Sequence, residues 1–256
     1  MSKPYYQDDW VTLYHGDCLE VMPALEDPVD MVLADLPYGT TRNAWDSIIP
    51  LDRMWAQYMR LVKPSAAIVL TAQTPFDKVL GASNLEDLRY EWIWEKTSAT
   101  GHLNAKRAPM KAHENILVFY KTLPTYNPQM TSGHVRKVST AEHKRNSTAT
   151  SNYGEFGLTG YDSTDRYPRS VLEFATDKQK EALHPTQKPL ALMAYLIRTY
   201  TNPGETVLDN CAGSGSTLIA ARRQGRRAIG IEISEQYCET IAKRCSQEGF
   251  DMEWTA

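Results

Sequence analysis

The 256-residue sequence has few features of a secreted, metal-binding or membrane protein. Its four cysteines, Cys18, Cys211, Cys238 and Cys245, lack the paired spacing of a metal site, so we predict no metal and no disulfide framework. No run approaches the ~20 apolar residues of a membrane helix, and the first ten residues contain no apolar signal core. These absences predict a soluble, cytoplasmic protein without a membrane partner.

An excess of positive charge is also missing, because the formal net charge is −3. A global basic field that would attract nucleic acid is therefore excluded, and any nucleic-acid-binding surface has to be local. What the chain does have is apolar residues, 42% of the total, which at this length can bury one good core with room for a modest insertion.

Short apolar runs alternate with longer amphipathic runs at both ends of the chain. "VDMVLAD" (29–35) and "AAIVLTA" (66–72) have the composition of strands, whereas "LDRMWAQYMRLVK" (51–63) has apolar residues at helical spacing. "ETVLDNCAGSGSTLIAARRQG" (205–225) is typical of a strand, a glycine loop and a helix. Strands that alternate with helices predict an α/β fold with a mainly parallel sheet.

The middle of the chain differs from both ends. Between residues 122 and 183 the periodicity fades, and Ser, Thr, Asn, Gly and Tyr accumulate. A structureless loop of that length is uncommon inside a compact domain. We therefore predict that 122–183 is an inserted lobe or functional loop, and that 1–121 and 184–256 together form one domain.

The glycine loop has an acidic partner at the next strand end. Asp209 ends one predicted strand, Gly213 and Gly215 occupy the turn, and Glu232 closes the following strand "AIGIE". An acidic residue at this offset can accept hydrogen bonds from both ribose hydroxyls of an adenosine. The loop lacks the third glycine of the dinucleotide fingerprint, which favours a mononucleoside ligand. An ordinary strand–helix turn with a capping hydroxyl is the alternative interpretation.

Four motifs resemble those of the permuted, beta-type DNA amino-methyltransferases. "HGDCLEVMPAL" (15–25) resembles the segment that leads into their catalytic strand, and "DLPY" (35–38) resembles their (D/N/S)PP(Y/F) catalytic motif. "HPTQKP" (184–189) resembles the segment before their cofactor loop, and "DNCAGSGST" (209–217) resembles the S-adenosylmethionine loop itself. The order of the motifs is the beta-type order, and the matches cover most of the chain outside 122–183.

The resemblance implies a Rossmann-like methyltransferase fold with a mainly parallel sheet, circularly permuted, with 122–183 as an inserted target-recognition region. In that fold a strand normally follows the helix that "EQYCETIAKRC" (235–245) predicts. Here the N-terminal "VTLYHGD" (11–17) is expected to supply that strand, so the two chain ends should lie near each other.

The chemistry of amine methylation accounts for the residue types of the "DLPY" motif. An exocyclic amine such as adenine N6 is a poor nucleophile because its lone pair is delocalised into the ring. The resemblance implies that Asp35 and the backbone carbonyl of Leu36 accept hydrogen bonds from the two N–H groups, which stabilises the positive charge that develops during transfer. Pro37 restricts Leu36 to extended conformations. Tyr38 offers a flat face to a base rotated out of the duplex, a stacking contact worth ~1–3 kcal/mol.

The resemblance also implies S-adenosyl-L-methionine as the cofactor and a set of residues around it. Asp17 would accept a hydrogen bond from the cofactor's adenine N6, with the Cys18 backbone beside it, and Lys188 would lie near the methionine carboxylate. Leu36, Asn210 and Cys211 depart from the family, which usually has Pro, Pro and Phe there. The expected cofactor-binding residues are Asp17, Cys18, His184, Lys188, Asp209, Asn210, Cys211, Gly213, Gly215, Thr217 and Glu232.

Two basic stretches predict a local DNA-binding face. Residues 96–121 contain five Lys or Arg against Glu114 alone, and 134–145 add four Lys or Arg against one Glu. Such runs are often only solvated surface, but beside a base-modifying motif phosphate contact is favoured. The expected DNA-binding residues are Lys106, Arg107, Lys111, Arg136, Lys137, Lys144 and Arg145.

The predicted function is site-specific methylation of adenine N6 in double-stranded DNA, because Asp at the first motif position favours adenine in this family, whereas cytosine-N4 enzymes more often carry Ser. Cytosine-N4 methylation, methylation of RNA or protein, and a DNA-binding module without catalysis are the alternatives. A homodimer and a cognate restriction endonuclease are further partners that the resemblance leaves open.

Overall fold

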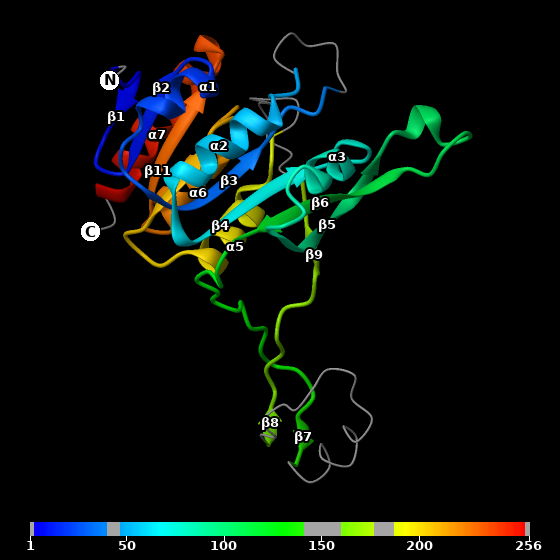
Figure 1. Cartoon of the computed structure of the whole chain (residues 1–256). Coiled ribbons are helices and arrows are strands. Elements are labelled where there is room, and N and C mark those ends of the chain that lie inside the picture. Colours follow the sequence, from blue (N-terminus) through cyan, green and yellow to red (C-terminus); the bar gives the residue numbers. More distant parts are fainter. Residues whose placement is uncertain (1–2, 40–46, 141–159, 177–186, 254–256) are drawn as a thin grey trace. The chain divides into compact units, whose positions relative to one another are not determined.

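A computed structural model of the chain describes residues 3–39, 47–140, 160–176 and 187–253. Its main feature is a nine-stranded sheet of order β1-β2-β11-β10-β3-β4-β6-β5-β9 (Figure 1). Two further strands, β7 and β8, form a separate sheet. The strands are β1 (Tyr6–Gln7), β2 (Val11–His15), β3 (Val29–Asp35), β4 (Val62–Ala72), β5 (Leu88–Thr100), β6 (Lys111–Phe119), β7 (Lys137–Ser139), β8 (Tyr161–Ser163), β9 (Val171–Phe174), β10 (Thr206–Asp209) and β11 (Arg227–Glu232).

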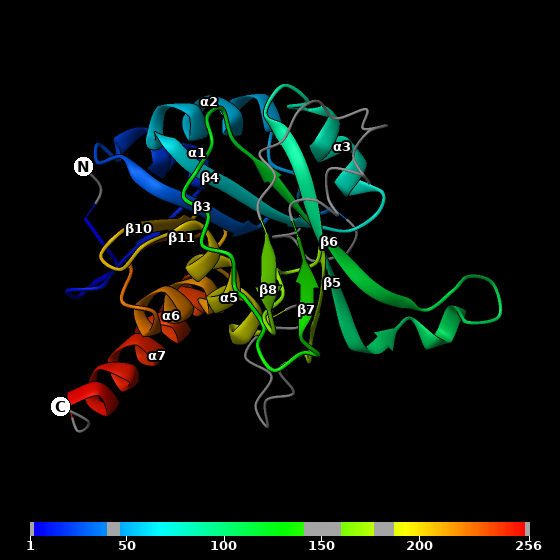
Figure 2. The same ribbon diagram turned by 90° about the horizontal axis from the view of Figure 1, so that it is seen from below.

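Helices cover both faces of the large sheet (Figure 2). α5, α6 and α7 contribute to one buried cluster, and α1, α2 and α3 contribute to the other. None of the described helices is both long enough and apolar enough to cross a membrane. The helices are α1 (Cys18–Val21), α2 (Leu51–Leu61), α3 (Phe76–Ala82), α5 (Leu190–Tyr200), α6 (Ser216–Arg223) and α7 (Glu235–Glu253), with short 3-10 helices η1 (Met22–Ala24) and η2 (His102–Asn104).

The strand order confirms the predicted circular permutation. β2 comes first in the chain, yet it pairs in parallel with β11, and Val11 lies opposite Ala228. α7 covers this pair, since Val11 shares a buried cluster with Cys238 and Ile241. β1, β2 and α7 therefore lie at the same end of the sheet (Figure 1). The N-terminal strand completes the sheet that the C-terminal part begins.

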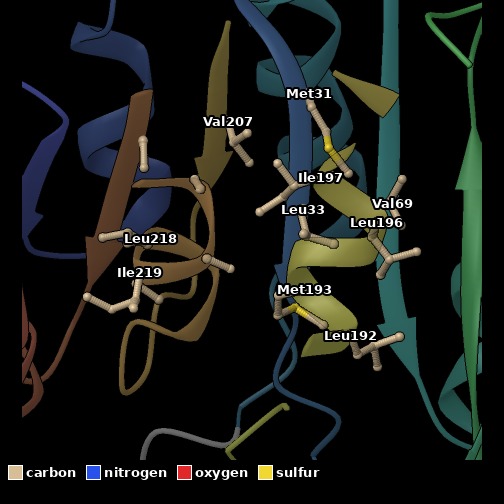
Figure 3. Close-up of a cluster of buried hydrophobic side chains, with 14 of the residues drawn as sticks. Met31, Leu33, Val69, Leu192, Met193, Leu196, Ile197, Val207, Leu218 and Ile219 are labelled. Carbon is tan, nitrogen blue, oxygen red and sulfur yellow. The ribbon is translucent and has the colours of Figure 1, made fainter. Parts of the chain in front are cut away.

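The apolar patterns of the sequence explain how the layers pack. α2 buries Met54, Trp55, Tyr58 and Leu61, whose spacing of three to four residues places them on one face of a helix. β4 is continuously apolar from Ala66 because both faces of this central strand are covered. α5 packs its apolar face against β3 and β4, with the side chains that Figure 3 labels: Met31, Leu33, Val69, Leu192, Met193, Leu196 and Ile197.

One boundary differs from the sequence-based expectation. The helical pattern extended over 51–63, but α2 ends at Leu61 and β4 begins at Val62. Pro64 accounts for the difference, because a proline disfavours helical backbone at the residue before it, Lys63. The chain therefore enters the strand directly from the helix.

Residues Pro128–Arg169 form a second compact unit, and all other residues belong to the first. This unit is narrower than the predicted insertion at 122–183. β9 lies within that range, but it pairs in parallel with β5 and so extends the large sheet. Within the second unit β7 and β8 are antiparallel, and the backbones of Thr131 and Arg166 exchange two hydrogen bonds of 3.0 and 2.8 Å.

Candidate active site

Three acidic residues end neighbouring strands at one edge of the large sheet. Asp35 ends β3, Asp209 ends β10 and Glu232 ends β11. These strands are parallel neighbours, so their carboxyl ends meet. The strand order reverses between β10 and β3, and open α/β sheets bind ligands in the crevice at such a switch point. The fold thus brings the predicted cofactor loop beside the predicted catalytic motif.

The glycine loop is held by the acidic residue that was predicted as its partner. Gly213 and Gly215 have φ angles of 53° and 82°, in the left-handed region that favours glycine. The N–H of Gly213 donates to Oε2 of Glu232 at 2.7 Å, and the N–H of Ser234 donates to Oε1 at 2.8 Å. Each carboxylate oxygen keeps a second lone pair that can accept a ribose hydroxyl. The arrangement fits an adenosine.

Asp17 and Cys18 reach the same edge through the end of β2. The N–H of Gly16 donates to the carbonyl of Glu232 at 2.9 Å, which places the start of α1 next to the end of β11. Oδ1 of Asp17 caps α1 by accepting the N–H of Leu19 at 2.8 Å. Asp17 is exposed and Cys18 is buried. The second carboxylate oxygen of Asp17 can accept an amine hydrogen bond at this position.

Asp209 is the most perturbed acid of the site. It is 3% exposed, and burial raises its pKa to about 7, although hydrogen bonds from the Thr217 side chain and the Cys211 backbone oppose the shift. The Cys211 N–H donates to its Oδ1 at 3.0 Å. Asp209 is therefore half-protonated near neutral pH, and a cationic ligand beside it would draw it into the ionised form.

We expect cofactor affinity to fall as the pH is lowered below about 7. S-adenosylmethionine is cationic, so its binding favours ionised Asp209, and a group that must lose a proton on binding weakens affinity by up to about tenfold per pH unit below its pKa. Calorimetry between pH 5.5 and 8 measures this. The Asp209→Asn variant, which cannot ionise, should show a flat profile over the acidic part of that range. A flat profile for the unmodified protein would contradict the role of Asp209.

The two residues that depart from the family motif are packed against α2 and α1. The buried Tyr58 hydroxyl donates to Oδ1 of Asn210 at 2.6 Å, and Nδ2 of Asn210 contacts the Cys211 sulfur at 3.5 Å. Its hydrogen bond with Cys18 and its burial hold the pKa of the Cys211 thiol well above the usual value. Cys211 is therefore a neutral thiol, which is unsuited to nucleophilic attack.

The Asp35 carboxylate is surrounded by donors. Asp35 lies opposite Thr71 of β4, and Oδ1 accepts hydrogen bonds from the Thr71 hydroxyl and, at 2.6 Å, from the Tyr38 hydroxyl. Oδ2 accepts one from Nζ of Lys188 at 2.5 Å. A carboxylate offers about four acceptor positions. Three are thus used by described partners, which leaves room for one more donor.

The remaining "DLPY" residues form the wall of this edge. Leu36 is buried, whereas Pro37 and Tyr38 are half-buried. The ring of Tyr38 lies 5.5 Å from the ring of Phe76, centroid to centroid, with a tilt of 31°. Burial and the neighbouring Asp35 charge hold the pKa of the Tyr38 hydroxyl well above its usual value, so it remains a donor. Tyr38 is therefore anchored by its hydroxyl and its contact with Phe76.

Lys188 has a place that the sequence did not predict. It was expected near the methionine carboxylate, but the described partners of its Nζ are Asp35 and, at 3.3 Å, Oε2 of Glu114. Thr71 and Glu114 were not predicted as site residues. Glu114 does carry a signal, because a carboxylate that opens the apolar strand "NILVF" needs a cationic partner. His184 lies outside the described residues.

The predicted basic residues of the first unit divide into two groups. Lys106, Arg107 and Lys111 are exposed on the long hairpin between β5 and β6 (Figure 2), whereas Lys96 is 8% exposed and pairs with Glu114 at 2.6 Å. Lys96 therefore does not belong to the exposed basic face to which its stretch was assigned. A strand residue whose side chain points inward cannot be told from sequence charge alone.

The predicted basic residues of the second unit also differ from one another. Arg136 binds the Asp162 carboxylate through two hydrogen bonds of 2.7 and 2.6 Å, so its charge is balanced within the β7–β8 hairpin. Lys137 is exposed. Lys144 and Arg145 lie outside the described residues.

The strand order and the paired strand ends define a methyltransferase of the DNA-modifying class, and three similar proteins support it. DNA adenine methyltransferase YhdJ of Escherichia coli K12 is 28% identical over 253 residues, which cover 91% of this chain and 82% of YhdJ. TTHA0409, a DNA modification methylase of Thermus thermophilus solved with S-adenosyl-L-methionine, is 25% identical with a TM-score of 0.59, covering 92% of this chain and 95% of that one. PvuII DNA methyltransferase (cytosine-N4-specific) has a TM-score of 0.67 at 17% identity, covering 94% and 88%, and shares the fold.

The chain belongs to the DNA methylase family of N6 and N4 methyltransferases, whose model matches residues 29–244. This confirms the family, the fold and the enzyme class that the four motifs predicted.

Proposed function

We propose that the protein moves a methyl group from S-adenosyl-L-methionine to the N6 amine of an adenine rotated out of duplex DNA. The observation that carries the proposal is the acceptor position left on Asp35, at a strand end next to the strand that carries the glycine loop. A planar amine needs two acceptors, and the Leu36 carbonyl follows Asp35 directly. YhdJ, which this chain resembles, is a DNA adenine methyltransferase.

The residues of the site divide the work of the transfer. When bound, S-adenosylmethionine supplies an electrophilic methyl carbon on its sulfonium. Asp35 and the Leu36 carbonyl hold the two N–H groups, so that the nitrogen lone pair points at that carbon. The N–C bond forms as the S–C bond breaks, and one amine proton leaves to water. Tyr38 stacks on the flipped base and excludes water from one side.

The second unit, Pro128–Arg169, supports the proposal of a target-recognition region within 122–183. Its exposed Lys137 can contact phosphate, and the polar side chains of the hairpin can reach base edges in a groove. A homodimer and a cognate restriction endonuclease remain proposals that the family supports.

The proposed base is tested by expressing the protein in a host without DNA methylation. We expect nucleoside analysis of the genomic DNA to show N6-methyladenine, and modification-sensitive sequencing to place it in one short sequence. N4-methylcytosine would replace adenine by the alternative substrate. Methyl groups on RNA or protein but not on DNA would overturn the proposal, and the Asp35→Ala variant is the control for host background.

A further inference from the structure

Four charged side chains form a row behind the acceptor of the target amine. Nζ of Lys96 lies 2.6 Å from Oε1 of Glu114, and Nζ of Lys188 lies 3.3 Å from Oε2 of the same carboxylate. Lys188 in turn lies 2.5 Å from Oδ2 of Asp35. Glu114 therefore sits between two cations, and Lys188 sits between two carboxylates.

The row is buried at every position except its functional end. The side chains of Lys96, Glu114 and Lys188 are 8%, 5% and 7% exposed, whereas that of Asp35 is 27% exposed. The four charges sum to zero, so the cluster is balanced as it stands. Removing one buried charge leaves another uncompensated, which is costly in a site of low dielectric.

The sheet fixes the geometry of the row. Glu114 lies opposite Trp94 on the β5–β6 ladder, and Lys96, two residues further along β5, points to the same face as Trp94. Asp35 is fixed by its register with Thr71. Lys188 comes from the segment just before α5 and reaches both carboxylates from 74 residues beyond Glu114 in the sequence.

We infer that Glu114, backed by Lys96, is a positioning residue that holds Lys188 against Oδ2 of Asp35 and so keeps the carboxylate turned toward the target amine. The inference rests on the proposed function, because it gives Asp35 the role of amine acceptor. Lys188 has three N–H donors. Two are directed at the carboxylates, and the third can still serve the cofactor carboxylate that the sequence suggested.

The physical reason is charge balance during the transfer. Burial alone would raise the pKa of Glu114, but Lys188 and Lys96 outweigh it and the pKa is lowered, so Glu114 carries its negative charge. Burial alone would lower the pKa of Lys188, but Asp35, Tyr38 and Glu114 outweigh it, so Lys188 is a cation. Without Glu114 the row carries a net positive charge, which opposes the positive charge that develops on the amine nitrogen.

A double-mutant cycle between Glu114→Gln and Asp35→Asn tests the inference on the full-length protein. We expect Glu114→Gln to slow single-turnover methyl transfer to a target duplex by roughly tenfold, since partners that orient a functional group typically cost 10–100-fold when removed. Cofactor and duplex dissociation constants should change less than about twofold. In the Asp35→Asn background, where residue 35 is neutral, the effect of Glu114→Gln should nearly vanish.

Independent effects would overturn the inference: if Glu114→Gln slowed transfer equally in both backgrounds, Glu114 would not act through Asp35. If instead the Asp35 variants were fully active, the proposed function would fail as well, so the two failures are distinguishable. Lys96→Met gives a second test should Glu114→Gln fail to fold, with a smaller loss that is coupled to Asp35 in the same way.

The matched control is Arg222→Met. Arg222 is equally buried and pairs with Asp8 at 2.7 Å, away from the strand ends of the site. We expect this variant to lower thermal stability but to leave the single-turnover rate unchanged in either Asp35 background. Coupling between Arg222 and Asp35 would show that any buried charge gives the effect, and would overturn the specific role of Glu114.

Discussion

Replacing Asp35 with alanine is expected to reduce the single-turnover rate of methyl transfer by ~10²–10³, the usual loss for one preorganised acceptor or donor in a site with little water. The change removes one of the two acceptors proposed for the target amine. It also removes the partner of Lys188 and of two hydroxyls, Tyr38 and Thr71. Single-turnover kinetics with saturating duplex and cofactor measure the chemical step directly.

Asparagine at the same position is expected to cost less than alanine, because its side-chain oxygen still accepts a hydrogen bond. The rates should therefore fall in the order Asp, Asn, Ala. The cofactor dissociation constant, measured by calorimetry, should be nearly the same in all three proteins because Gly213, Gly215 and Glu232 are untouched. Full activity of the alanine variant, or loss of cofactor binding with it, would remove Asp35 from the role of amine acceptor.

Removing two charges from the β5–β6 hairpin is expected to weaken duplex binding by roughly 60-fold at 0.1 M salt. Each phosphate contact contributes a slope of about 0.9 to the dependence of log affinity on log salt, so two contacts contribute roughly 1.8 decades at that concentration. The variant is Lys106→Ala/Arg107→Ala, since both side chains are exposed on the hairpin. Fluorescence anisotropy over a range of salt concentrations gives both the affinity and the slope.

The control removes the same charge from the other end of the sheet. Arg227 on β11 and Lys243 on α7 are also exposed, and the double variant Arg227→Ala/Lys243→Ala should leave the salt slope almost unchanged. If both double variants lost affinity equally, binding would reflect net charge rather than a hairpin contact. Cofactor affinity should be unchanged in both variants.

The sequence predicted the layers of the fold well because each pattern was local. The alternation of apolar residues in "VDMVLAD" and the helical spacing around Trp55 are set by which side faces the core, and both elements formed where they were expected. The topology was predictable only through the resemblance, since no local pattern says that β2 pairs with β11. The family supplied that long-range pairing.

The site was predictable at its strand ends and less so between them. Asp35, Asp209 and Glu232 each follow an apolar run, and parallel strands bring such ends together. The contact of Lys188 with Asp35 joins residues 153 positions apart, and Lys96 is turned inward by the pleat of β5. Whether a lysine lies on the surface or in an ion pair depends on tertiary packing, which charge counts along the sequence do not contain.

The pairing of β2 with β11 also sets the order of events while the chain is being made. Val11 leaves the ribosome long before its partner Ala228, and at ~5–20 residues per second the wait is roughly 10 to 40 seconds. β1 can shield one edge of β2 during this time, because it pairs with β2 locally. The other edge stays open as a template for a wrong strand until the last part of the protein arrives. The permutation thus makes the final strand, and with it the cofactor loop, the step that closes the sheet and protects the newborn chain from aggregation.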